Sequence, residues 1–320
     1  MSKARGLADL GNVYDDGALS NRNLIINSNF QVSQRGDFTS ASVVSNQSYY
    51  LDRWVMSVGI SGTLQDTGYK AKVVCTSTGS GVLAMSQNIE DKNIHPFKGK
   101  TVTVSCKMTS NSPNARIVIY ADNWLSLGNQ NDVHSGSGNE ETLSATFTVP
   151  SDLSGYLQVR VGFENAESNG NPSLSANDYF EVSDIQLEVG DTATPFEHPR
   201  SYSDELSRCQ RYFYSAADGT AQALGMGVYY TTTQMFGAIT FPVTMRATPT
   251  LAAASGSQYY EFIRDGGADY FNSLSLGNRT TNKIGEIQND SEVGGTGRIG
   301  YGGWIRTDNS SVYVHFDAEL

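Results

Sequence analysis

Apolar and polar residues alternate with a period of two over most of the chain from Asn23 onward. This alternation is typical of half-buried β-strands, because successive side chains of a strand point to opposite faces. It is clearest in TVTVSCKM (101–108), LSATFTVP (143–150) and YLQVRVGF (156–163). Roughly seven or eight such strands fit into residues 23–199, and they predict an antiparallel two-sheet sandwich of the jelly-roll type.

The same pattern predicts which side chains face the core. In 179–189 the apolar parity changes between Val182 and Ile185, so we expect a β-bulge near Ser183–Asp184 that returns both sets to the core. The residues expected to face inward in the three clearest strands are Val102, Val104, Cys106, Met108, Leu143, Ala145, Phe147, Val149, Leu157, Val159, Val161 and Phe163.

A different pattern follows the sandwich. Pro195 and Pro199 predict a stiff exit from the sheet, and the next residues have helical spacing. Ser201 or Ser203 is the candidate N-cap, with acidic residues in the first turn and arginines later. We therefore expect a short amphipathic connector helix within residues 200–214.

Alternation resumes after the helix and predicts a second, smaller β module over residues 215–320. At the other end, residues 1–22 are rich in Gly, Asp and Asn and show little periodicity. That segment is either a flexible terminus or an arm that becomes ordered by docking on a partner. A small module with long Gly-rich loops would gain stability by trimerising, so we expect a homotrimer.

Composition narrows the function classes. The formal net charge is −11, which disfavours nucleic acid and anionic membrane surfaces as partners. Cys75, Cys106 and Cys209 lack the spacing of a metal site or a disulfide framework. No apolar run is long enough for a signal peptide or a membrane span, so we expect synthesis in a cytoplasm and no membrane insertion.

Five blocks of sequence also carry a family resemblance. They are NLIINSNFQVSQRG followed by YYLDRW, then MSQNIED with FKGKTVTVSCKM, then TFTVPSD, and finally IQLEVGDTATPFEHPRSYSDELSRCQRYF. In this order they resemble the sandwich domain of bacteriophage and prophage tail fibres, over about residues 23–214. The jelly-roll itself is similar to carbohydrate-binding modules that begin with an N-L-I-x-N-x-x-F strand.

The ends of the chain resemble such fibres as well. RGLADLGNVYDDGALSNRN resembles the leader of fibre proteins of marine and cyanobacterial phages, and FPVTMRATPTLAAAS resembles the start of their distal β module. The resemblance implies a homotrimeric virion component, synthesised in the host bacterial cytoplasm and fixed to the tail by its N-terminus. The candidate attachment residues are Arg5, Leu7, Leu10 and Tyr14.

Catalytic patterns are missing from the sequence. The four histidines show neither a nucleophile elbow nor a ligand spacing around them, and we expect no enzymatic activity. Dispersed carboxylates could cleave glycosides, so a glycan depolymerase stays the least favoured hypothesis.

Sugar binding is the stronger hypothesis, because aromatic rings stack on pyranose C–H faces while amides and carboxylates bond the hydroxyls. The candidates are Trp124, Tyr259, Tyr260, Tyr301 and Trp304. For the last four, packing between subunits of a trimer is the alternative, and Trp124 could instead cover the sandwich edge.

A structural calcium ion is a further hypothesis. In carbohydrate-binding modules of this shape a calcium often joins the first strand to the last, and Asp184 with Asn27 or Asn29 matches those positions. The alternative is that Asp184 satisfies backbone donors exposed by the bulge.

These hypotheses lead to an expected function. The leading one is a tail-fibre protein that attaches the particle to host surface glycan or lipopolysaccharide through its distal domain. The alternative is a structural virion protein, such as a tail adaptor or capsid decoration, that has no receptor contact.

Overall fold

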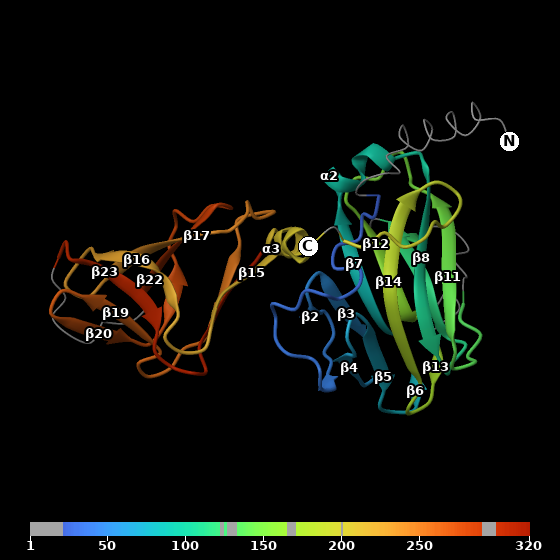
Figure 1. Cartoon of the computed structure of the whole chain (residues 1–320), viewed down its shortest axis with the longest axis horizontal. Helices are drawn as coiled ribbons and strands as arrows, with labels where there is room; N and C mark the ends of the chain where they lie inside the picture. Colours follow the sequence, from blue (N-terminus) through green and yellow to red (C-terminus); the bar gives the residue numbers. More distant parts are fainter. Residues whose placement is uncertain (1–21, 122–124, 127–132, 165–170, 200, 290–298) are drawn as a thin grey trace. The chain divides into compact units, whose positions relative to one another are not determined.

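The computed structural model describes residues 22–121, 125–126, 133–164, 171–199, 201–289 and 299–320. The chain forms two compact units, a sandwich unit that extends to Glu205 and a C-terminal unit over Leu206–Glu319 (Figure 1). The division falls inside helix α3 (Tyr202–Gln210), so the segment 200–214 that we expected to be a separate connector is divided between the two units.

The sandwich unit is built on two antiparallel sheets. In spatial order, the strands of the first sheet are β1 (Ser42–Val43), β4 (Gly62–Asp66), β5 (Ala71–Cys75), β14 (Tyr179–Val189), β8 (Thr101–Ser110) and β11 (Glu140–Thr148). Those of the second are β10 (Leu125–Ser126), β9 (Ala115–Ala121), β12 (Tyr156–Phe163), β7 (Leu83–Glu90), β3 (Trp54–Val58) and β2 (Tyr49–Leu51). The predicted mainly β jelly-roll sandwich is confirmed.

Both sheets contribute to one apolar core. Val104 on β8 and Val159 on β12 are fully buried in the same cluster, together with Phe30 and Trp54, whose rings lie 5.5 Å apart. All the inward-facing residues that the alternation predicted on 101–108, 143–150 and 156–163 are buried. Burial of alternate side chains on two facing sheets is the main stabilising contribution in such a fold.

The predicted bulge is present in β14. Its pairing with β8 shifts register between Ser183 and Gln186, and Asp184 takes a positive φ of 53°. Val182 and Ile185 are both fully buried as a result. The Asp184 carboxylate lies 2.8 Å from Lys107 Nζ on the neighbouring strand.

Short elements close the two ends of the sandwich. Helix α2 (Asp91–Ile94) and a 3₁₀ turn (His95–Phe97) lie at one end, and the small pair β6 (Gly79–Ser80) and β13 (Ser173–Leu174) lies at the other (Figure 1).

Helix α3 begins as the sequence predicted. Ser201 Oγ accepts a hydrogen bond from the backbone N–H of Asp204 at 3.1 Å, so Ser201 is the capping side chain. The buried carboxylate of Glu205 accepts a hydrogen bond from the backbone N–H of Asn27. The start of the helix is thereby bonded to the first segment of the sandwich unit.

The C-terminal unit contains a three-stranded and a seven-stranded antiparallel sheet. The smaller one consists of β15 (Phe213–Asp218), β24 (Tyr313–Asp317) and β18 (Thr250–Ala253). The larger one has the order β20 (Gly267–Phe271), β19 (Tyr260–Arg264), β23 (Gly302–Thr307), β16 (Ala223–Tyr229), β17 (Met235–Thr240), β22 (Ile284–Asn289) and β21 (Leu274–Leu276).

This unit has an apolar core of its own, in which Phe241 and Phe316 pack with ring centroids 4.9 Å apart. The buried carboxylate of Asp269 lies beside this core. Asp269 accepts hydrogen bonds from the Tyr229 hydroxyl at 2.5 Å and from Arg264 Nε and Nη2 at 2.6 and 2.9 Å. In both units together, the cysteines Cys75, Cys106 and Cys209 are free thiols and are buried. Within the described part of the chain, no helix is long and apolar enough to cross a membrane.

Candidate functional site

The predicted tip aromatics are not equivalent. Tyr260 is fully buried, stacks on Phe271 with ring centroids 5.4 Å apart, and donates its hydroxyl proton to the Ala254 carbonyl at 2.6 Å. Such a ring offers no face to a ligand, so Tyr260 leaves the set of candidate contact residues.

Tyr259 and Tyr301 are half-buried and pack against the same core. The Tyr259 ring lies over Gly256, where it fills the space that a Cβ would take. The Tyr301 carbonyl accepts a hydrogen bond from Tyr229 N at 3.0 Å. Both residues therefore have a packing role, and neither is paired with Trp304 in the sheet.

Trp304 is the most exposed of the candidates that the structure describes. On β23 the neighbouring Gly303 and Ile305 are buried, and the alternation turns the Trp304 side chain to the outer face, where it is 54% exposed. Strands β19 and β16 pair with β23 on both sides, with Trp304 opposite Ile263 and Met226. The indole is therefore presented from a strand whose backbone is fixed on both sides.

The register places further apolar side chains beside this ring. Met226 is 60% exposed and pairs with Ala238, which extends the Trp304 row across β17. One row along, Val228 pairs with Phe236 on the same outer face. Paired side chains on one face lie about 4.5–5.5 Å apart at Cβ, so they are in contact. We call this surface the Trp304 face; it consists of Ile263, Trp304, Met226, Ala238, Val228 and Phe236.

A polar row flanks the Trp304 face. Arg306, two residues along β23, lies on the same side of the sheet and pairs with Glu261, which in turn pairs with Tyr270. Arg306 Nε donates a hydrogen bond to Glu261 Oε1. This bond raises the pKa of the Arg306 guanidinium above its usual value. The Glu261 carboxylate is almost completely buried, whereas the Arg306 side chain is 41% exposed.

Glycines make the opposite side of these strands close-packed. A Cβ on Gly237 would lie 2.3 Å from Ile305 Cδ1, and one on Gly303 would lie 2.2 Å from the Ile263 carbonyl oxygen. Ile305 thus packs over the glycines on the core side, while Trp304 stands on the outer side. The glycines of this sequence, which first indicated turns, are here needed within strands for close approach.

Another polar cluster lies on β12 of the sandwich. Arg160 donates a hydrogen bond to Glu164, and its guanidinium lies 5.1 Å from the Tyr120 ring centroid. The pKa of the Tyr120 hydroxyl is raised by burial and by Glu164. Arg160 and Glu164 are each about 95% buried, so this cluster presents no accessible charge.

The three predicted calcium ligands do not form a ligand set. Asp184 is paired with Lys107, and the Asn27 side chain donates to the carbonyls of Val32 and Asp52 while accepting from Val32 N. Asn29 is buried on the same segment. Among the described residues, no group of three or more His, Cys, Asp or Glu side chains could hold a metal ion.

The remaining candidates lie outside the described residues. They are Trp124 and the four attachment candidates Arg5, Leu7, Leu10 and Tyr14. Their roles stay predictions.

Sequence reasoning missed the neighbours of Trp304. Val228 and Phe236 belong to the segment VYYTTTQMFGAIT, which the sequence indicates only as β-like, and Met226 lies two residues before it. The signal that could have found them is the run LGMGV (224–228), in which glycines fall on one parity and large apolar residues on the other. A strand with glycine on one face and apolar side chains on the other presents those side chains away from a close-packed core.

Comparison with known proteins gives distant likenesses only. No family model matches the chain, and no curated protein matches it. Among solved structures the chain is similar to a CBM4 module at 15% identity, covering 51% of this chain and 98% of that one, with a TM-score of 0.33.

Two further likenesses are of the same kind. The CBM22-1–CBM22-2 tandem domain of Paenibacillus barcinonensis Xyn10C is 11% identical, covers 89% of this chain and 98% of that one, and has a TM-score of 0.31. TmCBM61 in complex with β-1,4-galactotriose is 13% identical, covers 53% and 100%, and has a TM-score of 0.24. At these identities and TM-scores, the likenesses say nothing about what this chain binds.

Proposed function

We propose that this chain is a component of a bacteriophage tail fibre that attaches the particle to host cell-surface glycan through the Trp304 face. The observation that carries the glycan part is the half-exposed indole of Trp304 on a strand paired on both sides. A flat aromatic ring on a strand whose backbone is already ordered can stack on the C–H face of a sugar without loss of backbone freedom on binding.

The polar row beside the Trp304 face supplies hydrogen-bond donors for sugar hydroxyls. A guanidinium carries five N–H donors, and the exposed side of Arg306 can bond sugar hydroxyls while Nε stays bonded to Glu261. Because Glu261 balances the charge of Arg306 and the chain has a net charge of −11, the site favours a neutral glycan over an acidic one.

The virion part of the proposal rests on the ordered sequence motifs of residues 23–214 and on the two terminal segments. In this proposal three copies form a fibre, the segment before Arg22 attaches it to the tail, and the C-terminal unit meets the host. Several weak sugar contacts per particle then add up to firm attachment. Antibody labelling of intact particles with electron microscopy tests this location.

A structural role without receptor contact is the second candidate, and the apolar composition of the Trp304 face favours it. Met226, Val228 and Phe236 are the kinds of side chain that interfaces between proteins bury. In that case copies of the chain, or another virion protein, cover this face and no glycan reaches it.

We assign no catalytic residue. Glu261 and Glu286 are the described carboxylates on the outer side of this sheet, and each is bonded to an arginine, Arg306 or Arg279. Glycoside cleavage requires one carboxyl group as a proton donor and a second as base or nucleophile. Neither of these two is left available for that role.

Binding to an immobilised array of bacterial polysaccharides tests the proposal. We expect Trp304→Ala to weaken binding at least tenfold, which corresponds to about 1.4 kcal/mol, and Trp304→Phe to retain part of it. Tyr69→Ala is the matched control, since Tyr69 is 65% exposed on a turn of the sandwich unit and should not matter.

Sedimentation of the same variants separates the two candidates. A glycan site requires that Trp304→Ala lose binding while its oligomeric state stays that of the wild type. If Trp304→Ala binds the array as the wild type does, the site is wrong. If the variant in addition dissociates into smaller species, the structural role is the better account.

A further inference from the structure

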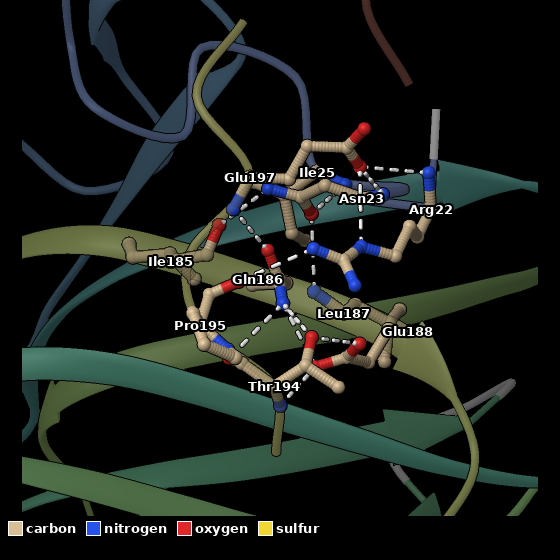
Figure 2. Close-up of polar contacts among 10 residues, drawn as sticks. All are labelled: Arg22, Asn23, Ile25, Ile185, Gln186, Leu187, Glu188, Thr194, Pro195 and Glu197. Atoms are coloured by element: carbon tan, nitrogen blue, oxygen red, sulfur yellow. Dashed lines mark hydrogen bonds and ion pairs between the residues drawn. The ribbon is translucent and has the colours of Figure 1, made fainter. Parts of the chain in front are cut away.

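The segments through which the chain enters and leaves the sandwich unit are bonded to the same strand. Figure 2 shows Arg22, Asn23 and Ile25 of the entry segment and Thr194, Pro195 and Glu197 of the exit segment beside β14, joined by polar contacts. We call this arrangement the clasp; it consists of Arg22, Asn23, Leu24, Gln186, Leu187, Glu188, Thr194, Pro195 and Glu197.

The entry segment is held through main-chain and side-chain bonds. Leu24 N donates to the Leu187 carbonyl at 3.0 Å, and Leu187 N donates to Asn23 Oδ1 at 3.1 Å. Asn23 Nδ2 donates to the Ile185 carbonyl at 2.9 Å. Because Asn23 is 93% buried, these bonds are shielded from water, and breaking one leaves a buried polar group unsatisfied.

The exit segment is held by two buried side chains of β14. Gln186 Oε1 accepts from Glu197 N at 2.7 Å. The Glu188 carboxylate accepts from Thr194 N at 2.8 Å and from Thr194 Oγ1 at 2.6 Å. Gln186 and Glu188 have almost no exposed surface, so the exit segment satisfies groups that would otherwise be buried without partners.

Entry and exit also contact each other directly. Glu197 Oε2 accepts hydrogen bonds from the backbone N–H groups of Arg22 at 2.9 Å and of Asn23 at 3.4 Å. Arg22 Nη2 donates to the Pro195 carbonyl at 3.3 Å. Residues 22 and 197 are therefore hydrogen-bonded to each other, although most of the sandwich lies between them in sequence.

The direction of the two segments matters for mechanics. Along the entry segment, Leu24 is bonded to Leu187 and Ser28 to Ile185, so this segment runs antiparallel to β14. Along the exit segment, Thr194 is bonded to Glu188 and Glu197 to Gln186, which is also antiparallel. Entry and exit thus run in the same direction, and tension on the chain pulls residue 22 and residue 198 in opposite directions along β14.

Tension of this kind shears the clasp. Bonds spread along a strand are then loaded together, whereas bonds pulled from one end would break in sequence. We infer that the clasp transmits tension between the residues before 22 and those after 197 and so keeps load off the sandwich core. The sandwich would then be a side module of a chain that works under tension, whatever ligand the C-terminal unit binds.

Single-molecule force spectroscopy tests this inference on the full chain, with handles at the N- and C-termini. The unfolding event of the sandwich is identified by the longer chain it releases. We expect Glu197→Ala to raise the unfolding rate of the sandwich at a given force at least tenfold, because forced unfolding follows the unfolding barrier. Glu181→Ala is the matched control, since Glu181 is also on β14 but bonds Thr67 and not the clasp.

A second pair of attachment points separates the clasp from general stability. With both handles inside the sandwich, at the exposed positions 69 and 152 through Tyr69→Cys and Asp152→Cys, the load passes neither residue 22 nor residue 197. The inference requires that Glu197→Ala weaken the N-to-C geometry only. Equal rates for Glu197→Ala and the wild type in the N-to-C geometry, or an equal loss in both geometries, would overturn it. Thr194→Val, which removes the hydroxyl bond to Glu188, serves as the second probe if Glu197→Ala does not fold.

Discussion

Single positions decide which aromatic rings this protein shows to solvent. Trp304 lies between the buried Gly303 and Ile305, and Tyr260 shares the parity of the buried Phe262. The sequence predicted aromatic candidates but not their faces, because two adjacent tyrosines, 259 and 260, always point to opposite sides of a strand. Tyr260 lies on the same face of the strand as Phe262, so it is buried if that face meets the core. The sequence alone does not tell which face does.

Tyr229 provides a test at the residue scale. Its hydroxyl donates to the buried Asp269 carboxylate, so Tyr229→Phe should lower the free energy of unfolding of the C-terminal unit by about 1–3 kcal/mol. Tyr230→Phe is the control, since Tyr230 is 68% exposed. Urea denaturation monitored on both variants measures the difference, and equal midpoints for the two would contradict the assigned role of this hydrogen bond.

The same residue gives a pH dependence. Burial, followed by the bond to Asp269, raises the pKa of the Tyr229 hydroxyl. A group whose pKa is raised on folding contributes its full stability below its unfolded pKa, here about 10, and loses it as the pH rises through the folded value. The stability difference between wild type and Tyr229→Phe should therefore be constant up to about pH 10 and shrink above it.

At the scale of elements, the alternation of apolar residues predicted most of the sandwich. Val102 to Met108 and Leu157 to Phe163 face the core as expected, and the phase change in 179–189 is the bulge at Asp184. The close approach of β16, β17 and β23 was not predictable in this way. It depends on which glycines of distant segments become neighbours, as Gly227 and Gly237 do, and local periodicity does not contain that pairing.

Two adjacent glycines of β23 test the packing of this element. A Cβ on Gly303 would lie 2.2 Å from the Ile263 carbonyl oxygen, whereas one on Gly302 would come no closer than 3.8 Å to the Gly227 carbonyl oxygen. We expect Gly303→Ala to destabilise the C-terminal unit by about 1–3 kcal/mol, because backbone atoms must move to admit the methyl group. Gly302→Ala should change the unfolding midpoint little.

Thermal unfolding of the two variants measures this difference. Near-equal midpoints would show that β19 and β23 can separate at no cost, and the fixed placement of Trp304 would lose its basis. A large loss in Gly302→Ala as well would indicate that both positions are limited by backbone conformation and not by contact with Ile263.

At the scale of the whole molecule, the chain consists of two units that each have their own core. The sequence predicted the two β modules from the helical pattern that interrupts the alternation. It did not predict the clasp, since Asn23 and Glu197 are separated by most of the sandwich and their contact follows from the fold. The proposed homotrimer and its place in a virion stay predictions at this scale.

The central claim is that glycan contacts the Trp304 indole, and nuclear magnetic resonance tests it most directly. Indole N–H signals of the full chain are recorded while a polysaccharide retained on the array is added, with Trp304→Phe used to assign the signal of Trp304. The account predicts a saturable shift of that signal and no shift for Trp54, which is buried and donates its indole proton to the Asn27 carbonyl at 3.0 Å. An unchanged Trp304 signal at a polysaccharide concentration that saturates binding would contradict it.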